Sequence, residues 1–454
     1  MQRTLPEDQG RVQHGPPPPP PGLPVLPELA EALADAADLT RVDPPGGGTE
    51  IRDAAAAHWH RRSLPVEAHE VVAAPGAPPL LFALMAAIGG DVLLPRPCPA
   101  WWAPQVRLLG GARAAYHVPT PAECGGVPDP YALLETVRRV RAEGGAPRLL
   151  VLSVPDDPTA TVAPPEVVHQ VCEAALAEGL FVVSDETWRD TLHRPTRTPV
   201  HRPAPRPSHR PPHHGTTGRT VLSPRPGPGT PTGPTGPGTP PLPGPVFLSA
   251  AEMFPDHVVV LSDLAGALVP TTWRVAVARL PDTAYGSALR ARVLDALAAL
   301  GATVPAPLAA AATYALGDPE PVVTRARAAA ALHARVQHAV LHEVLAAGAL
   351  ARPPTAGRHL YADLDPLRDG LAARGVSDSM ELEEYLSGRL GTPVPGGHRF
   401  GDPLSALRVR ISTAPLLGAT PEERMESLSA EEPLELPHLE QALNHLGTAL
   451  AELG

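Results

Sequence analysis

The stretch from residue 148 to residue 186 constrains the fold more than any other part of the chain. Residues 148–154, RLLVLSV, have the composition of a buried strand, and residues 180–186, LFVVSDE, have that of another. Between them, residues 164–179 show the spacing of an amphipathic helix, with proline near its start and glycine at its end. Short apolar strands joined by single helices form βαβ units, which predicts a mainly parallel sheet.

The same alternation continues along the chain and then changes. Strands are predicted at 257–263 and 274–280, and an alanine-rich helix at 318–348. A mixed pattern follows: a strand in RHLYADLD, a helix through SMELEEYLSGRLG, a strand in ALRVRIST and a final helix after Pro437. We therefore expect an α/β fold with a large domain at 65–317 and an interdomain helix with a smaller α+β domain at 318–454. Residues 25–64 are expected to form an N-terminal arm and part of the small domain.

Two proline-rich tracts interrupt this pattern, at 1–24 and at 193–245. Such a composition cannot bury a core or sustain a strand ladder, so both tracts are predicted to be disordered. The second contains His201, His209, His213 and His214, which we interpret as part of a solvated linker and not as a metal site, because nothing fixes their geometry. Its PxxP-like spacing leaves open a partner domain that binds polyproline.

Composition excludes several classes of protein. The formal net charge of −11 argues against a nucleic-acid binder with a basic surface. The three cysteines lie far apart without CxxC spacing, so neither a disulfide framework nor a zinc site is expected, and a reducing cytoplasm is the simplest location. No stretch has the signal-peptide pattern or the apolar length of a membrane span, so no membrane association is predicted.

Lysine is absent from the chain. All 37 residues counted as Lys plus Arg are arginine. A genome with strong GC bias would reduce lysine generally, but selection would retain a lysine that chemistry required. This absence excludes any mechanism that needs an ε-amino group supplied by this chain.

Two polar turns follow neighbouring predicted strands: Asp157-Pro158-Thr159-Ala160, and Ser184-Asp185-Glu186-Thr187-Trp188. They resemble the Asn-Pro-Thr-Gly and Ser-Asp-Glu-x-Tyr turns of class I/II aminotransferases, which are fold type I pyridoxal-phosphate-dependent enzymes. The interval of 28 residues (185 minus 157) accommodates one helix and one strand, as that family requires. PPGGGTEIRDAAAAHW, GGDVLLPRPCPAWW, PVPGGHRFGD and RVRIST resemble further motifs of the family in the same order. The resemblance covers roughly residues 25–450.

The resemblance implies pyridoxal 5′-phosphate, or pyridoxamine phosphate, as a noncovalent cofactor. Asp185 would pair with the pyridine nitrogen and hold the ring as an electron sink. Asp157 stands where the family has an asparagine that donates to the 3′ oxygen, and an ionised carboxylate has no donor to offer. Trp188 stands where a tyrosine contacts the same oxygen, and its indole donates from a different position.

For the cofactor's phosphate, the resemblance points to a turn at a helix N-terminus and to a later segment. The turn is represented by Gly76 and Ala77, although Pro78 removes one amide donor. In the later segment, Ser262 and Arg274 are the candidate phosphate ligands. The alternative is that they are an ordinary strand-end hydroxyl and a surface arginine.

Two more positions match the family's substrate site. Trp101 is a candidate to stack on the cofactor ring, with a core tryptophan as the alternative. Arg410 matches the arginine that clamps a substrate carboxylate, so an amino or keto acid is the expected ligand. Because the family builds its sites at a twofold interface, a homodimer is also expected.

The family's Schiff-base lysine precedes its Gly-x-Arg motif by about eight residues. Counting back from Arg274 places that position on Gly266, or on Ala265 if one residue is inserted. Neither side chain can form a Schiff base or move a proton, so no catalytic residue is assigned. Three hypotheses remain open: an aminotransferase, a catalytically inactive protein that binds a ligand or a protein partner, and a protein that uses pyridoxamine phosphate as a cosubstrate.

Overall fold

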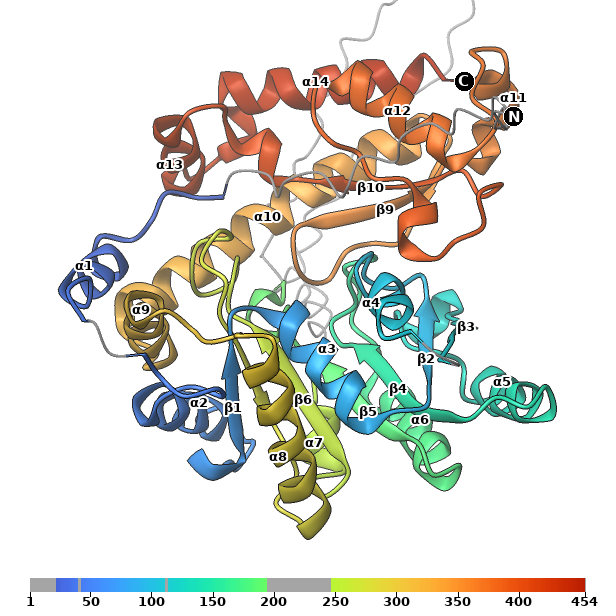
Figure 1. The fold of residues 1–454 in the computed structure, drawn as a ribbon. Helices are drawn as coiled ribbons and strands as arrows, with labels where there is room; N and C mark the ends of the chain where they lie inside the picture. The colour runs from blue at the N-terminus through green and yellow to red at the C-terminus, as the bar shows by residue number, and fades with distance from the viewer. Residues whose placement is uncertain (1–21, 40–41, 111–112, 194–245, 454) are drawn as a thin grey trace, which may run out of the picture. The chain divides into compact units, whose positions relative to one another are not determined.

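In the computed structural model, the described residues are 22–39, 42–110, 113–193 and 246–453. They contain two sheets (Figure 1). The strands are β1 (Val71–Ala74), β2 (Asp91–Arg96), β3 (Ala115–Pro119), β4 (Pro147–Ser153), β5 (Phe181–Asp185), β6 (Val258–Asp263), β7 (Ala276–Arg279), β8 (Leu350–Ala351), β9 (His359–Asp363) and β10 (Arg408–Ser412).

The larger sheet has seven strands in the order β1-β7-β6-β5-β4-β2-β3. Strands β3, β2, β4, β5 and β6 run parallel to one another, and β7 runs antiparallel to both β6 and β1. The carboxyl ends of the parallel strands therefore meet at one edge, where an open α/β sheet places its ligands.

Both faces of this sheet are covered by helices because its strands are apolar on both sides (Figure 1). Along β5, Val182 belongs to an apolar cluster that includes residues of α2, α5, α6, α7 and α9, whereas the next residue, Val183, belongs to a cluster that includes residues of α3, α4 and α8. This alternation follows from the two-residue period of a strand.

Fourteen α-helices lie in the described residues. They are α1 (Pro27–Asp35), α2 (Thr49–His60), α3 (Ala77–Ile88), α4 (Trp102–Leu108), α5 (Pro130–Ala142), α6 (Pro165–Ala177), α7 (Ala250–Met253), α8 (Ala284–Ala299), α9 (Ala306–Leu316), α10 (Glu320–Ala346), α11 (Arg368–Ala372), α12 (Ser379–Leu390), α13 (Pro421–Ser429) and α14 (Pro437–Ala451).

The smaller sheet has the order β10-β9-β8, with antiparallel pairs throughout. A separate apolar cluster joins it to α10, α12 and α14, including Val336, Leu360, Val409 and Leu446. On β10, Val409 and Ile411 face this cluster, so Arg410 points to the other side of the strand. The small sheet thereby presents Arg410 away from its own core.

The structure confirms the predicted α/β class with a mainly parallel sheet and a second, C-terminal α+β layer. Helix α6 lies between β4 and β5 as predicted, and α10 falls within the predicted long helix. The division into domains stays a prediction, since both sheets fall within one compact unit. The proline-rich tract, with His201, His209, His213 and His214, lies outside the described residues apart from His193, as does most of the predicted N-terminal tract.

No helix in the described part of the chain combines the length and apolar character needed to cross a membrane.

Candidate functional site

A cavity of about 1120 Å³ lies at the carboxyl edge of the large sheet. Its lining comes from segments that are far apart in sequence: the turns after β1, β2, β4, β5 and β6, and residues on and around β9 and β10. Of the predicted site residues, those that line it are Ala77, Trp101, Asp157, Asp185, Trp188, Ala265, Arg274 and Arg410. The fold thus brings together eight positions spread over more than three hundred residues.

Asp157 and Arg410 form an ion pair inside this cavity. Arg410 Nη1 donates to Asp157 Oδ1 at 2.8 Å. The guanidinium of Arg410 also lies 4.7 Å from the ring centroid of Phe400, which fixes its plane by a cation–π contact. A ligand carboxylate that approaches Arg410 therefore has to compete with a carboxylate supplied by the chain itself.

Asp185 ends β5 and is held by its own turn. The Thr187 hydroxyl donates to Asp185 Oδ1 at 2.5 Å and accepts from the Asp263 amide at 3.0 Å, so one hydroxyl connects the ends of β5 and β6. Burial raises the pKa of Asp185 to about 7, and the negative charges of Asp263 and Asp157 act in the same direction. Asp185 is therefore a carboxyl group that titrates near neutral pH.

Asp263 ends β6, and its carboxylate lies against the start of α3. The Ala77 amide donates to Asp263 Oδ2 at 2.8 Å, and the Ala265 amide donates to Oδ1 at 2.9 Å. Ser262, one residue earlier, pairs with Val277 of β7 and faces the opposite side of the sheet. Asp263, which sequence reasoning did not select, is thus the β6 side chain that lines the cavity.

Gly76 and Arg274 flank this carboxylate. A Cβ on Gly76 would lie 3.6 Å from Asp263 Oδ2 and 3.4 Å from Arg274 Cβ. The charge of Arg274 favours the ionised form of Asp263, although burial raises the pKa of that carboxyl overall. Gly76 and Arg274, both predicted to contact the cofactor's phosphate, therefore lie close together, but the carboxylate of Asp263 lies beside them.

The two candidate lysine positions differ in their surroundings. Ala265 lines the large cavity, whereas Gly266 lines a smaller one of about 80 Å³. Gly266 has φ = 91°, a conformation that disfavours residues with a side chain. A Cβ at this position would lie 2.8 Å from Arg358 Nη2, so Arg358 already fills the space into which a side chain at 266 would extend.

Arg358 lines both cavities and is the principal residue that sequence reasoning missed. Its guanidinium lies 5.3 Å from the ring centroid of Trp188, and its Nε atom is buried without a hydrogen-bond partner among the described residues. Burial lowers the pKa of Arg358 to about 10, and the charge of Arg410 adds to this effect. A cation with an unpartnered N–H indicates a place for an anionic or carbonyl ligand.

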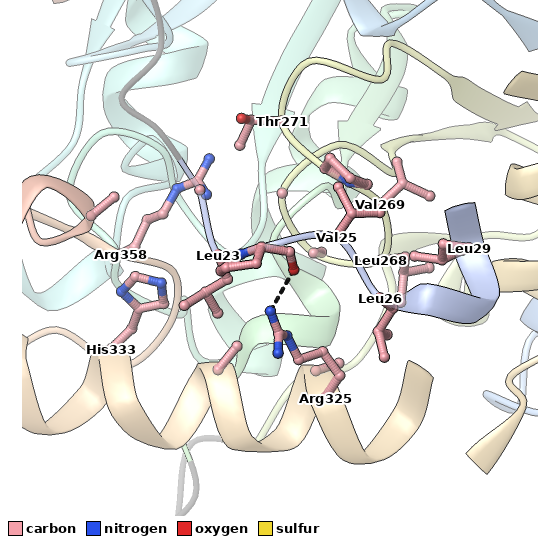
Figure 2. A pocket seen from close by; sticks show the side chains of 18 of the residues that line it. Leu23, Val25, Leu26, Leu29, Leu268, Val269, Thr271, Arg325, His333 and Arg358 are labelled. Carbon is pink, nitrogen blue, oxygen red and sulfur yellow. Dashed lines mark hydrogen bonds between the residues drawn. The ribbon is translucent and has the colours of Figure 1, made fainter. Parts of the chain in front are cut away.

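Figure 2 shows the smaller cavity, which lies between the N-terminal segment, the loop after β6 and α10. The N-terminal segment that includes Leu23 and Val25 lies over the loop that carries Leu268 and Val269. Arg325 of α10 donates to the Pro24 carbonyl at 2.6 Å and ties that segment down. The loop after β6 is thereby covered on the side away from the large cavity.

The remaining wall of the large cavity was also missed. It includes His117, His359, Arg399 and Asp402. Burial lowers the pKa of His359 well below its ordinary value, with Arg410 and Arg358 contributing, so this imidazole is neutral at physiological pH. Arg399 and Asp402 lie in the PVPGGHRFGD segment, whose pattern could have pointed to them, whereas no local motif marks His117 or His359.

The fold is that of the aspartate aminotransferases. The aspartate aminotransferase from Thermus thermophilus with maleate superposes with a TM-score of 0.68 over 95% of this chain and 90% of that one, at 21% identity. The N-succinyldiaminopimelate aminotransferase from Mycobacterium tuberculosis superposes with a TM-score of 0.67 over 94% of this chain and 91% of the other, at 19% identity.

Sequence comparison finds a family resemblance over part of the chain. Residues 17–220 match the model of the aminotransferase class I and II family. A probable aspartate/prephenate aminotransferase from Thermus aquaticus is 35% identical over 158 residues, which is 34% of this chain and 39% of that relative. The corresponding protein from Aquifex aeolicus is 30% identical over 154 residues, or 33% and 37% of the two chains. The matched region thus spans well under half of these relatives.

The family implies pyridoxal 5′-phosphate, but the residues of this cavity do not fit it. The chain has no lysine to bond the aldehyde. The amide at the start of α3 is already taken by Asp263, and Asp157 replaces an amide donor with a carboxylate that is engaged by Arg410. We therefore derive no chemical step through this cofactor.

Proposed function

We propose that this protein is a catalytically inactive relative of the aminotransferases that binds a small carboxylate ligand, an amino acid or a 2-oxo acid, in the large cavity. The observation that carries the proposal is the Arg358 guanidinium, whose Nη2 lies 2.8 Å from the position of a Cβ at Gly266. A residue that binds anions thus fills the space beside the position where the family has its reactive amine.

The charges around the cavity support a carboxylate ligand. Arg358 keeps an unpartnered Nε atom and a pKa lowered to about 10, so it remains protonated at neutral pH with hydrogen-bonding capacity to spare. Arg410 lowers that pKa further, and Asp157, which pairs with Arg410, offsets the repulsion between the two cations only in part. A ligand carboxylate would relieve this repulsion.

Maleate is a suitable probe, because the Thermus aspartate aminotransferase structure includes it. Isothermal titration of the full chain with maleate is expected to show saturable binding that weakens about tenfold or more in Arg358→Gln, a loss of about 1.4 kcal/mol. Arg292 of α8 is exposed and serves as the matched control, with no change expected in Arg292→Gln. Absence of maleate binding to the wild-type chain, or an equal loss in the control, would overturn the proposal.

An aminotransferase activity is the second candidate, and one observation favours it: Asp185, to which the resemblance assigns the pairing with the cofactor ring, lines the same cavity as Arg410. Incubation with pyridoxamine phosphate and a mixture of 2-oxo acids tests it. We expect no amino acid to form faster than in buffer, because no side chain in the position of the lysine can move a proton. Formation at an enzymatic rate would establish this candidate instead.

We also infer a homodimer from the fold likeness. Light scattering during size-exclusion chromatography measures the mass in solution, and a value near the 47.4 kDa of one chain would contradict the inference.

A further inference from the structure

We propose that the carboxylate of Asp263 occupies the anion-binding position at the N-terminus of α3. The cavity then admits carboxylate ligands and excludes ligands that carry a phosphate group. The inference deepens the proposed function, on which it rests for the location of the ligand.

The N-terminus of α3 has few free donors. A helix offers its first amides to an anion, and this helix has twelve residues. Here Pro78 and Pro79 have no N–H, and the Gly76 amide donates to the Ala74 carbonyl at 2.8 Å. The Ala77 amide is the donor that remains in this turn, and Asp263 Oδ2 accepts from it at 2.8 Å.

The carboxylate is held from both sides. Its second oxygen, Oδ1, accepts from the Ala265 amide at 2.9 Å, and the amide of Asp263 itself donates to the Thr187 hydroxyl at 3.0 Å. The residue is 8% exposed, so the group is not a mobile surface side chain that a ligand could displace at little cost. Asp263 thus occupies the anion-binding position of α3 before any ligand binds.

An incoming phosphate would meet a buried negative charge where the helix dipole would otherwise favour an anion. Two anions in contact repel strongly where one of them is buried, and the charge of Arg274 beside Asp263 offsets part of this repulsion. A ligand that places its carboxylate near Arg358 or Arg410 avoids this position. The position of Asp263 therefore selects against phosphate without blocking the opposite side of the cavity.

The test compares inorganic phosphate, pyridoxal and pyridoxal 5′-phosphate by titration of the full chain, with ³¹P NMR as a second readout for phosphate. The wild-type protein is expected to show no saturable phosphate binding and no preference for pyridoxal 5′-phosphate over pyridoxal. Asp263→Ser frees the Ala77 amide and removes the charge, so it is expected to bind phosphate and to prefer the phosphorylated aldehyde by about tenfold or more.

Two further variants separate the causes. Asp263→Asn removes the charge but keeps an acceptor beside the Ala77 amide, so a smaller gain in phosphate affinity than in Asp263→Ser is expected. Asp402→Asn is the matched control, because Asp402 lines the same cavity but bonds to Tyr361 and Arg408. Phosphate binding by the wild-type chain, or an equal gain in Asp402→Asn, would overturn the inference, and the wild-type measurement decides even if Asp263→Ser does not fold.

Maleate titration of the same preparations distinguishes the two proposals. If the wild-type chain excludes phosphate and Asp263→Ser binds it, the inference stands even where maleate fails to bind, and the proposed function falls alone. If maleate binds and the wild-type chain also binds phosphate, the proposed function stands and the inference falls.

Discussion

The guanidinium of Arg358 lies beside Gly266 so closely that its Nη2 is 2.8 Å from the position of a Cβ there. The spacing predicts that Gly266 or Ala265 corresponds to the family's lysine, and Arg358 lies just before β9, 92 positions beyond Gly266 (358 minus 266). A guanidinium, which forms no Schiff base, therefore lies beside one of the two positions predicted to correspond to that lysine.

Gly266→Ala is expected to destabilise the protein by about 2–3 kcal/mol, because φ = 91° strains any other residue and the new Cβ meets Arg358. Gly301 is a matched control with φ = 60° and open space around its Cβ, so Gly301→Ala is expected to cost about 1 kcal/mol. Urea unfolding measures both. Adding Arg358→Ala to Gly266→Ala should recover part of the loss, and equal losses in the two glycine variants would contradict the clash.

Asp157→Asn is expected to increase the affinity for maleate by about tenfold. The wild-type carboxylate holds Arg410 at 2.8 Å, and an amide in its place leaves the guanidinium charge available to the ligand. Titration calorimetry gives the affinity. Asp363→Asn provides the comparison, since Asp363 accepts from the neighbouring Arg408 and not from Arg410; a gain of the same size there would show that the effect is general electrostatics.

Asp185→Asn is expected to stabilise the protein in a pH-dependent manner. The pKa of Asp185 is raised from 3.8 to about 7 in the folded state, so between these values the folded chain holds a proton that the unfolded chain has released. Stability of the wild-type protein then falls as pH rises through this window, and the asparagine variant lacks that loss.

The difference between variant and wild type should therefore be small near pH 4 and reach about 2 kcal/mol or more above pH 7. Thermal unfolding across that range measures it. Asp295→Asn, at an exposed position of α8, should show no such trend. A constant difference at every pH would mean that Asp185 is ionised throughout.

Ala265→Lys would introduce the only lysine of the chain, at a position that lines the large cavity. We expect this variant to form an adduct with pyridoxal that borohydride fixes at residue 265, as read by peptide mass spectrometry. Because Asp263 is expected to exclude phosphate, pyridoxal 5′-phosphate should label the variant less than pyridoxal does, and adding Asp263→Ser should reverse the order. In the wild-type chain only the α-amino group can react, which sets the background.

Much of the fold was predictable from the sequence because it depends on local periodicity. The strands at β4, β5 and β6 and the helix α6 were found from runs of apolar residues. The selection of Asp185, which ends β5, and of Asp157, in the turn after β4, follows from the rule that parallel strands end at one edge. Arg410 was found because a recognisable pattern surrounds it. Ser262 was selected in place of Asp263, because strand alternation distinguishes adjacent residues only once it is known which helices cover each face of the sheet.

The sequence by itself determined that this chain folds as a parallel α/β sheet with a smaller C-terminal layer, and that it supplies no lysine for chemistry. Only the tertiary structure decided which side chains meet around the large cavity: Asp263 against the start of α3, Arg358 beside Gly266, and Arg410 paired with Asp157. The physical reason is the sequence separation of the contacting residues. Hydrophobic periodicity acts between neighbours along the chain, whereas these three contacts join residues 92 to 253 positions apart (358 minus 266, and 410 minus 157), and no local pattern encodes them.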